Sequence, residues 1–260
     1  MGEELVLYEV SDGVATVTLN DPEKANRLSG EMLVQLVEAI RRAKGDEEAK
    51  AVVLTGAGEK AFCAGADLGG FGADAPMVQK HFASDLFLEY FRLMPRLGKP
   101  SLCAANGHVL AGGLGLALSC DLLIAKQGVK FATPEINVGA FPYMIMAVIY
   151  RNVPRKNVNE MMLLGERMTA EEAVTYGLAN KVVPEAEYEE AVRDWASKLA
   201  SKSPVLMRLG HDAMYRQQDM AFDDALEFLR SQLTLTFSTE DIIEGVTAFF
   251  EKRDPEWKGR

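Results

Sequence analysis

The sequence predicts an α/β fold of repeated β-β-α units followed by a helical C-terminal region. Short apolar runs of strand length alternate with helical patterns up to residue 184, and from Glu185 onward the pattern is mostly helical. The chain has 260 residues, 48% of them hydrophobic, and shows no long linker. It can therefore bury a large core. We expect a core over residues 1–184 and a helical region over residues 185–260.

The first elements predicted along the chain are a hairpin and a helix. Residues 5–10 and 14–19 read as two strands around the turn Asp12-Gly13. Ser29 can cap a helix, because the residues after it repeat with helical periodicity. The apolar face of that helix consists of Met32, Leu33, Leu36, Val37 and Ile40.

Later elements follow from similar signals. Strands are expected at residues 51–55, 101–105 and 122–125, and a helix continues through Tyr150. Thr169 and Glu172 form a capping box for a short helix that ends near Gly177. Residues 181–184 then close the core, and Pro204 lies near the start of one C-terminal helix.

A glycine pair upstream of one carboxylate is the main functional signal. The apolar run of residues 102–105 ends at Asn106-Gly107, and Gly112-Gly113 then opens a helix whose first amide hydrogens are unpaired. A helix start of this kind favours developing negative charge. With Glu135 downstream as an acid/base, the segment predicts an active site for carbonyl chemistry.

Residues 61–67, Ala-Phe-Cys-Ala-Gly-Ala-Asp, form a second small-residue turn after an apolar strand. Two such turns can converge on one oxygen atom. Backbone N–H groups from Ala66 and Gly112 would then form an oxyanion hole, with each donor contributing about 3–4 kcal/mol in a water-poor site.

The same residues also allow purely structural interpretations. A lone glutamate after proline can cap the next element or lie in a solvated loop. Gly112-Gly113 can equally serve close packing between a helix and a strand.

Composition and charge argue against several classes of function. The net charge of −10 argues against nucleic acid as a partner, because a phosphate backbone calls for a basic face. The three cysteines fit neither a disulfide framework nor a metal site, and no dinucleotide fingerprint appears. No membrane span or targeting segment is recognisable. We expect a cytoplasmic protein without a metal or a redox cofactor.

Five motifs resemble those of the enoyl-CoA hydratase/isomerase, or crotonase, superfamily. They occur in the family's order and at its spacing over nearly the whole chain. The motifs are residues 61–67, residues 106–113 (Asn-Gly-His-Val-Leu-Ala-Gly-Gly), Cys120-Asp121, residues 133–136 (Thr-Pro-Glu-Ile) and residues 244–253 (Glu-Gly-Val-Thr-Ala-Phe-Phe-Glu-Lys-Arg).

The resemblance implies a crotonase-like spiral that holds an acyl-CoA thioester, with coenzyme A entering as part of the substrate. The thioester carbonyl would accept hydrogen bonds from the N–H groups of Ala66 and Gly112, and these hydrogen bonds would stabilise an enolate. It also implies a homotrimer or a dimer of trimers, in which residues 185–260 mediate oligomerisation or cover the site. The residues implied in CoA binding are Lys24, Ala25, Arg27, Ala64, Asp67, Leu68, Phe249 and Lys252, the last reaching a CoA phosphate across a subunit boundary.

One departure from the family pattern bears on the reaction. Hydratases of the family carry two glutamates, and here the first position is Gly115 while the second is Glu135. A single carboxylate suits a proton shuttle between two carbons of the acyl chain, so double-bond isomerisation is expected. Hydration of a 2-enoyl-CoA is the alternative, since losing one acid/base costs about 10²–10⁴-fold in rate. Other enolate chemistries and a non-catalytic CoA-binding paralogue also stay open.

A second departure concerns the acyl pocket. Residues 139–146 (Gly-Ala-Phe-Pro-Tyr-Met-Ile-Met) stand where typical hydratases are rich in glycine. We expect a reshaped pocket lined by Gly115, Phe141, Pro142 and Tyr143. Core packing of the helix through Tyr150 is the alternative role for these bulky side chains.

Overall fold

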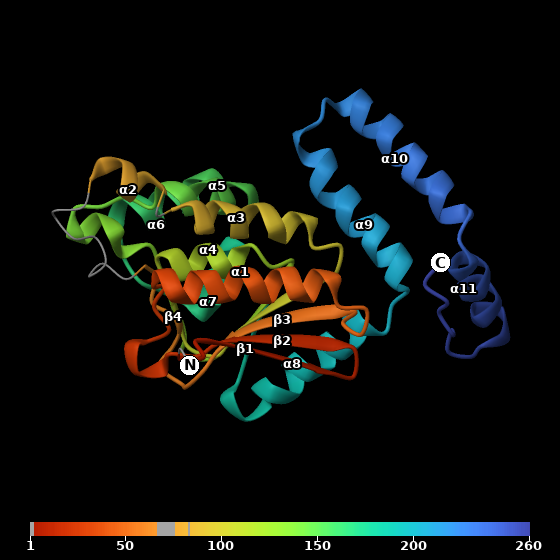
Figure 1. Ribbon diagram of the computed structural model, residues 1–260, viewed down its shortest axis with the longest axis horizontal. Coiled ribbons are helices and arrows are strands. Elements are labelled where there is room, and N and C mark those ends of the chain that lie inside the picture. The colour runs from red at the N-terminus through yellow and green to blue at the C-terminus, as the bar shows by residue number, and fades with distance from the viewer. Residues whose placement is uncertain (1–2, 67–75, 83) are drawn as a thin grey trace.

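The computed structural model describes residues 3–66, 76–82 and 84–260, and these residues form two β-sheets with covering helices (Figure 1). The larger sheet has the strand order β1-β2-β3-β5-β7-β10, and the smaller sheet has the order β4-β6-β8-β9. The strands are β1 (Val6–Ser11), β2 (Val14–Leu19), β3 (Ala51–Gly56), β4 (Ala61–Cys63), β5 (Ser101–Ala105), β6 (His108–Leu110), β7 (Leu122–Lys126), β8 (Lys130–Ala132), β9 (Met168–Thr169) and β10 (Lys181–Val183).

Repeated β-β-α units generate this arrangement, as the sequence predicts. The β1–β2 hairpin is antiparallel, and β2, β3, β5, β7 and β10 pair in parallel. In three successive units the first strand joins the larger sheet and the second joins the smaller one. The helices of the units are α1 (Gly30–Gly45), α2 (Met77–Phe82), α3 (Asp85–Leu93), α4 (Gly112–Leu118), α5 (Tyr143–Asn152), α6 (Arg155–Leu164) and α7 (Ala170–Tyr176). Single 3-10 turns are η1 (Pro22–Lys24), η3 (Met94–Arg96), η4 (Pro134–Val138) and η5 (Gln217–Asp219).

The smaller sheet corrects the interpretation of residues 61–67 as a turn from the first residue onward, and it adds a strand after Gly107 that the sequence did not predict. Ala61–Cys63 forms β4, and His108–Leu110 forms β6 between Gly107 and the glycine pair. β4 is buried throughout and β6 only at Val109, and each strand is only three residues long. Such runs are too short to show a periodicity.

Two hydrophobic clusters hold the larger sheet between helical layers. α1 packs on one side, and its apolar face is the predicted one; the Ser29 hydroxyl accepts from the Met32 N–H at 3.1 Å. On the other side lies α8 (Glu185–Ala200), whose Tyr188 and Ala196 are buried against Val53 and Ala104. The capping box of Thr169 and Glu172 also forms as predicted, and α7 ends at Tyr176 with Gly177 as its C-cap.

The last three helices stand away from the sheets as an arm (Figure 1). They are α9 (Pro204–Arg216), α10 (Phe222–Phe237) and α11 (Glu240–Glu251). Asp121 fixes α9 to the core, because its carboxylate accepts from the Tyr215 hydroxyl at 2.6 Å and from the Ser101 N–H at 2.7 Å. The division of the chain at residue 185 stays a prediction. Within the described ranges, no helix has the length and hydrophobicity needed to cross a bilayer.

Candidate active site

The turn after β4 packs directly against the first turn of α4. A methyl group built on Gly65 would lie 2.5 Å from the Ala111 Cβ and 3.0 Å from the Gly112 nitrogen. A methyl group on Gly113 would lie 2.5 Å from the Cys63 carbonyl oxygen. Glycine is therefore required at both positions, and the two turns singled out in the sequence are in contact.

Two hydrogen bonds orient the peptide groups at this contact. The Gly65 carbonyl accepts from the Leu28 N–H at 2.8 Å, and the Ala111 carbonyl accepts from the Leu114 N–H at 2.9 Å. In a trans peptide the N–H points opposite to the carbonyl, and no described peptide bond is cis. The N–H groups of Ala66 and Gly112 are thus aimed away from Leu28 and Leu114 respectively. Two preorganised donors of this kind can stabilise a developing oxyanion.

Ala111, the residue before the glycine pair, has a strained backbone. Its φ of 49° and ψ of −127° form a combination that non-glycine residues rarely adopt and that costs on the order of 1–3 kcal/mol. The surroundings hold it there, because its N–H donates to the Ala132 carbonyl at 2.9 Å. Ala132 ends β8, from which the chain continues directly to Glu135. Ala111 therefore connects the start of α4 to the segment that carries the carboxylate.

Glu135 lies in η4 and is half-buried. Its Oε2 atom is inaccessible to solvent and has no hydrogen-bond partner within the described part of the chain. Burial raises the pKa of this carboxyl above its usual value, and a hydrogen bond to its own backbone opposes that rise only partly. A buried carboxylate oxygen without a partner is suited to take up and release a proton.

Gly115 stands where hydratases of the resembled family carry a glutamate. The space beside it is filled by other side chains. A methyl group built there would lie 2.4 Å from Ile145 Cγ2 and 3.0 Å from Phe91 Cζ. Ile145 belongs to α5 and Phe91 to α3, so two elements converge on this point. Among the described residues, the site therefore has a carboxylate at Glu135 and an apolar contact at Gly115.

The segment predicted to line CoA lies beside the same turn. The Ala64 N–H donates to the Ala25 carbonyl at 3.0 Å, and Leu28 pairs with Ala66 as an isolated parallel bridge. Between them, the buried Asn26 donates to the carbonyls of residues 57 and 61. The structure thus brings Lys24, Ala25, Arg27 and Ala64 to the edge of the candidate site. The predicted residues Asp67 and Leu68 lie outside the described residues.

The predicted acyl-pocket residues divide between core and surface. Phe141 is half-buried and packs on the main core, as do Met144 and Met146. Pro142 caps α5, and Tyr143 is 73% exposed with its ring 5.4 Å from that of Phe141. Sequence reasoning missed Phe87, whose ring lies 3.4 Å from a methyl group built on Gly112. It also missed Leu28 and Ile145, since backbone pairing and side-chain direction leave no sequence motif.

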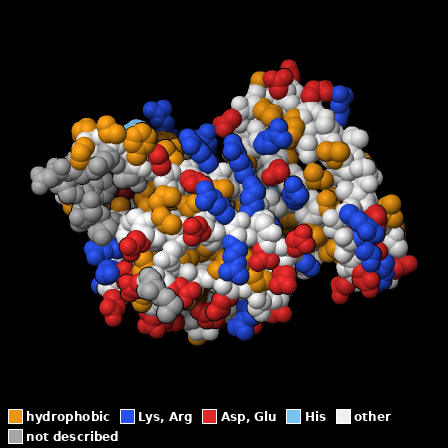
Figure 2. Space-filling model, viewed as in Figure 1, with side chains coloured by type: hydrophobic (Ala, Val, Ile, Leu, Met, Phe, Trp, Pro, Cys, Tyr) orange, Lys and Arg blue, Asp and Glu red, His pale blue; other side chains and the backbone are white. Residues whose placement is uncertain are grey.

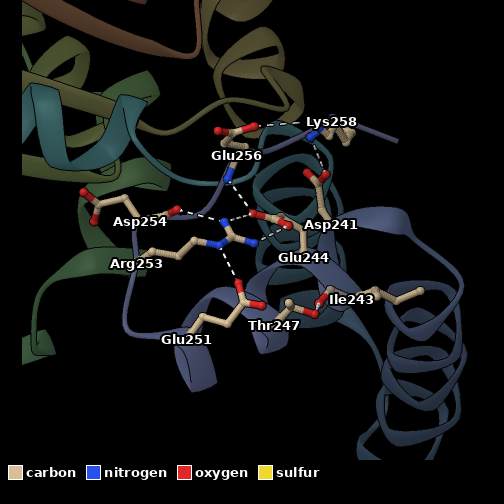
Figure 3. Close-up of polar contacts among 9 residues, drawn as sticks. All are labelled: Asp241, Ile243, Glu244, Thr247, Glu251, Arg253, Asp254, Glu256 and Lys258. Carbon is tan, nitrogen blue, oxygen red and sulfur yellow. Dashed lines mark hydrogen bonds and ion pairs between the residues drawn. The ribbon is translucent and has the colours of Figure 1, made fainter.

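Phe249 and Lys252 do not join this group within one chain. They lie at the end of α11, on the opposite side of the molecule from β4 (Figure 1). Figure 3 shows how the end of α11 is fixed: Arg253 pairs with Glu244 at 2.6 Å and with Glu251 at 2.7 Å. The Arg253 contact lowers the pKa of the Glu244 carboxyl to about 2. Lys252 itself caps the helix with a φ of 55°, and Phe249 is 78% exposed.

Comparison with known proteins shows the family to which the chain belongs. The family model described as enoyl-CoA hydratase/isomerase matches residues 9–260. The chain is 34% identical to the (E)-benzylidenesuccinyl-CoA hydratase of Thauera aromatica, covering 98% of this chain and 99% of the relative. It is 35% identical to the short-chain-enoyl-CoA hydratase of Clostridium acetobutylicum, covering 95% of each. A crystal structure of an enoyl-CoA hydratase from Mycobacterium smegmatis superposes with a TM-score of 0.93 at 34% identity, covering 98% of this chain and 99% of the other. The chain therefore belongs to the enoyl-CoA hydratase/isomerase family, the crotonase superfamily, and is an acyl-CoA enzyme of that type.

Proposed function

We propose that the N–H groups of Ala66 and Gly112 form the oxyanion hole for the thioester carbonyl of an enoyl-CoA. The contact between their two turns and the fixed directions of the two amides support this assignment. Donors held in place before the reaction stabilise the enolate oxygen more than the neutral carbonyl. The acidity of the carbon next to the carbonyl therefore rises in the bound substrate.

The reaction that this site supports best is isomerisation of a 3-enoyl-CoA to a 2-enoyl-CoA. Glu135 as carboxylate removes a proton from C2, and the electron pair delocalises into a dienolate held by the oxyanion hole. The resulting carboxylic acid returns the proton to C4, and the double bond moves to C2–C3. Atoms and charge balance without water, because one carboxyl group takes up the proton and gives it back.

The observation that carries this proposal is the contact at Gly115. A glutamate there would need the space that Ile145 and Phe91 occupy. Hydration requires a water molecule to be oriented and deprotonated while a proton reaches C2, a task that two carboxylates share well. An apolar side chain at this point excludes water instead and leaves the proton transfer to Glu135.

Hydration of a 2-enoyl-CoA is the second candidate, and the names of the relatives favour it. Both relatives described above are named hydratases. Under this alternative Glu135 alone would orient the water, or another group would replace the missing carboxylate.

We further propose that CoA is bound between subunits of a homotrimer or a dimer of trimers. Lys24 and Arg27 supply positive charge at the edge of one subunit's site, while Lys252 and Phe249 come from the arm of a neighbour. Hydrophobic side chains gather on the surface of this arm (Figure 2), and they include Phe222, Leu226, Leu233, Phe237, Phe249 and Phe250. Exposed apolar patches of this kind mark interaction surfaces. Sedimentation equilibrium tests the assembly, since a monomer would contradict it.

Replacing Glu135 with Gln tests the role of this carboxylate. We expect E135Q to lower the isomerisation rate by at least about 10²-fold, because the amide cannot accept the C2 proton. Its affinity for a saturated acyl-CoA should stay within about 3-fold of the parent, since the oxyanion turns are unchanged. E166Q is the matched control: it changes an exposed carboxylate on the segment that packs against η4. Unaltered turnover in E135Q would contradict the proposal.

A further inference from the structure

Cys63 is the last residue of β4, and its thiol contacts the candidate oxyanion turn. The Gly65 N–H donates to Cys63 Sγ at 3.4 Å, in a bond buried from solvent. Burial raises the pKa of this thiol to about 12, so the sulfur is present as a neutral thiol at physiological pH. A neutral, fully buried thiol is inert as a nucleophile, and it can still act as a weak acceptor.

The peptide groups on both sides of Gly65 are therefore held. Its N–H is bound by Cys63 Sγ, and its carbonyl is bound by the Leu28 N–H at 2.8 Å. The carbonyl of Gly65 and the N–H of Ala66 belong to one planar peptide group, so fixing one fixes the other. Gly65 has a φ of 90°, a region that glycine enters without a steric penalty and also leaves easily. The sulfur contact restricts that freedom.

Cys63 also contacts the second turn. Its carbonyl oxygen and Cβ lie 2.5 and 2.7 Å from a methyl group built on Gly113, next to Gly112. One residue thus touches both segments that carry the proposed donors. Its sulfur atom contacts the first donor turn, and its carbonyl oxygen and Cβ contact the second.

We propose that Cys63 is a positioning residue that sets the direction of the Ala66 N–H through the N–H···S bond to Gly65. The inference rests on the proposed oxyanion hole and extends it to a side chain that does not itself touch substrate. It predicts that the acceptor atom at position 63, and not merely the filling of that space, controls how strongly the carbonyl is polarised.

Three variants separate the acceptor from the packing. C63A removes the acceptor and leaves the Gly65 N–H buried without a partner. C63S keeps an acceptor on a side chain of similar shape. C103A is the matched control, because it also removes a sulfur atom from a fully buried position. Cys103 lies in β5 and not in the strand that leads into the donor turn. Melting temperatures of all three variants establish that they are folded.

The readout is the absorbance of a conjugated dienoyl-CoA bound to each protein, recorded immediately after mixing. Carbonyl polarisation in an oxyanion hole moves this band to longer wavelength. We expect the shift in the parent, in C63S and in C103A, and a clearly smaller shift in C63A. The isomerisation kcat of C63A should fall about 10-fold with little change in KM, less than the 10²–10³-fold that follows the loss of a whole donor.

The possible outcomes separate a failure of the proposed oxyanion hole from a failure of the role proposed for Cys63. A parent protein that binds the dienoyl-CoA without any shift would overturn the oxyanion hole and this inference together. A full shift and full kcat in C63A would overturn the role of Cys63 alone. Equal losses in C63A and C103A, or a C63S variant that behaves like C63A, would assign the effect to packing and also overturn it.

Discussion

At the scale of single residues, the candidate site depends on backbone groups that side-chain packing holds in place. The proposed donors are the amides of Ala66 and Gly112, and their directions follow from hydrogen bonds to the carbonyls of Gly65 and Ala111. Glu135 is the side chain that performs chemistry in this account. Its environment is unfavourable for a charge, because Oε2 is buried without a partner among the described residues. The function proposed for Glu135 therefore has a cost in stability.

Because of Glu135, the free energy of unfolding should fall as pH rises. The pKa of Glu135 is raised in the folded protein, so the folded state is favoured most below the unfolded pKa of about 4.3, and the advantage is lost as pH rises through the folded pKa. We expect E135Q to exceed the parent in unfolding free energy at pH 7, by on the order of 1 kcal/mol. The difference should vanish near pH 4. Urea unfolding at both pH values measures it, and a variant less stable than the parent at pH 7 would contradict the account.

The sequence indicates the candidate residues of the site, but it does not indicate their contacts. Glu135, the glycine pair and the 61–67 turn are visible as motifs, because the chemistry requires those residue types. The roles of Leu28 and Cys63 are not visible, since one acts through its backbone and the other through a bond to a residue two positions away. Ile145 is equally hidden, because periodicity indicates that it is buried but not what it contacts.

At the scale of elements, the larger sheet and α1 are predictable while the smaller sheet is not. α1 spans 16 residues with a continuous apolar face, so its helical period is evident. The strands of the smaller sheet are two or three residues long, and tertiary pairing alone makes them strands. This sheet nevertheless matters for the candidate site, because β4 and β6 lead into the two turns that are in contact, and β8 leads into the segment that carries Glu135.

The contact between α4 and α5 yields a prediction about the second carboxylate. G115E alone should destabilise the fold by about 1–3 kcal/mol or more, because the new side chain overlaps Ile145 and buries a charge. G115E/I145A should recover part of the stability and hydrate a 2-enoyl-CoA at least about 10-fold faster than the parent. Melting temperature and product mass measure the two effects.

I145A alone is the control for that double variant. It should lose about 2–4 kcal/mol through the cavity it creates, without any gain in hydration. A G115E protein that is as stable as the parent would show that α5 leaves room for the carboxylate, and the explanation for the single acid/base would then fail.

At the scale of the whole molecule, the fold separates the reaction from the proposed assembly surface. The sheets and α4 hold the candidate site, and the arm of α9–α11 extends away from it (Figure 1). Its last helix carries Phe249 and is capped by Lys252. Two sets of hydrogen bonds fix the arm. Asp121 binds Tyr215 of α9, and the buried Asp241 of α11 accepts from the Ser203 hydroxyl and from the N–H groups of Lys258 and Gly259. A neighbour's arm could thus present Lys252 in a defined position.

In the proposed reaction, one carboxylate moves a proton between two carbons without adding water. The most direct measurement is the product mass and conjugated-thioester absorbance when the purified protein is given a medium-length 3-enoyl-CoA or 2-enoyl-CoA. We expect the 3-enoyl-CoA to become a 2-enoyl-CoA with no gain in mass, and the 2-enoyl-CoA to gain water slowly or not at all. Rapid gain of one water by the 2-enoyl-CoA, without isomerisation of the 3-enoyl-CoA, would contradict this proposal.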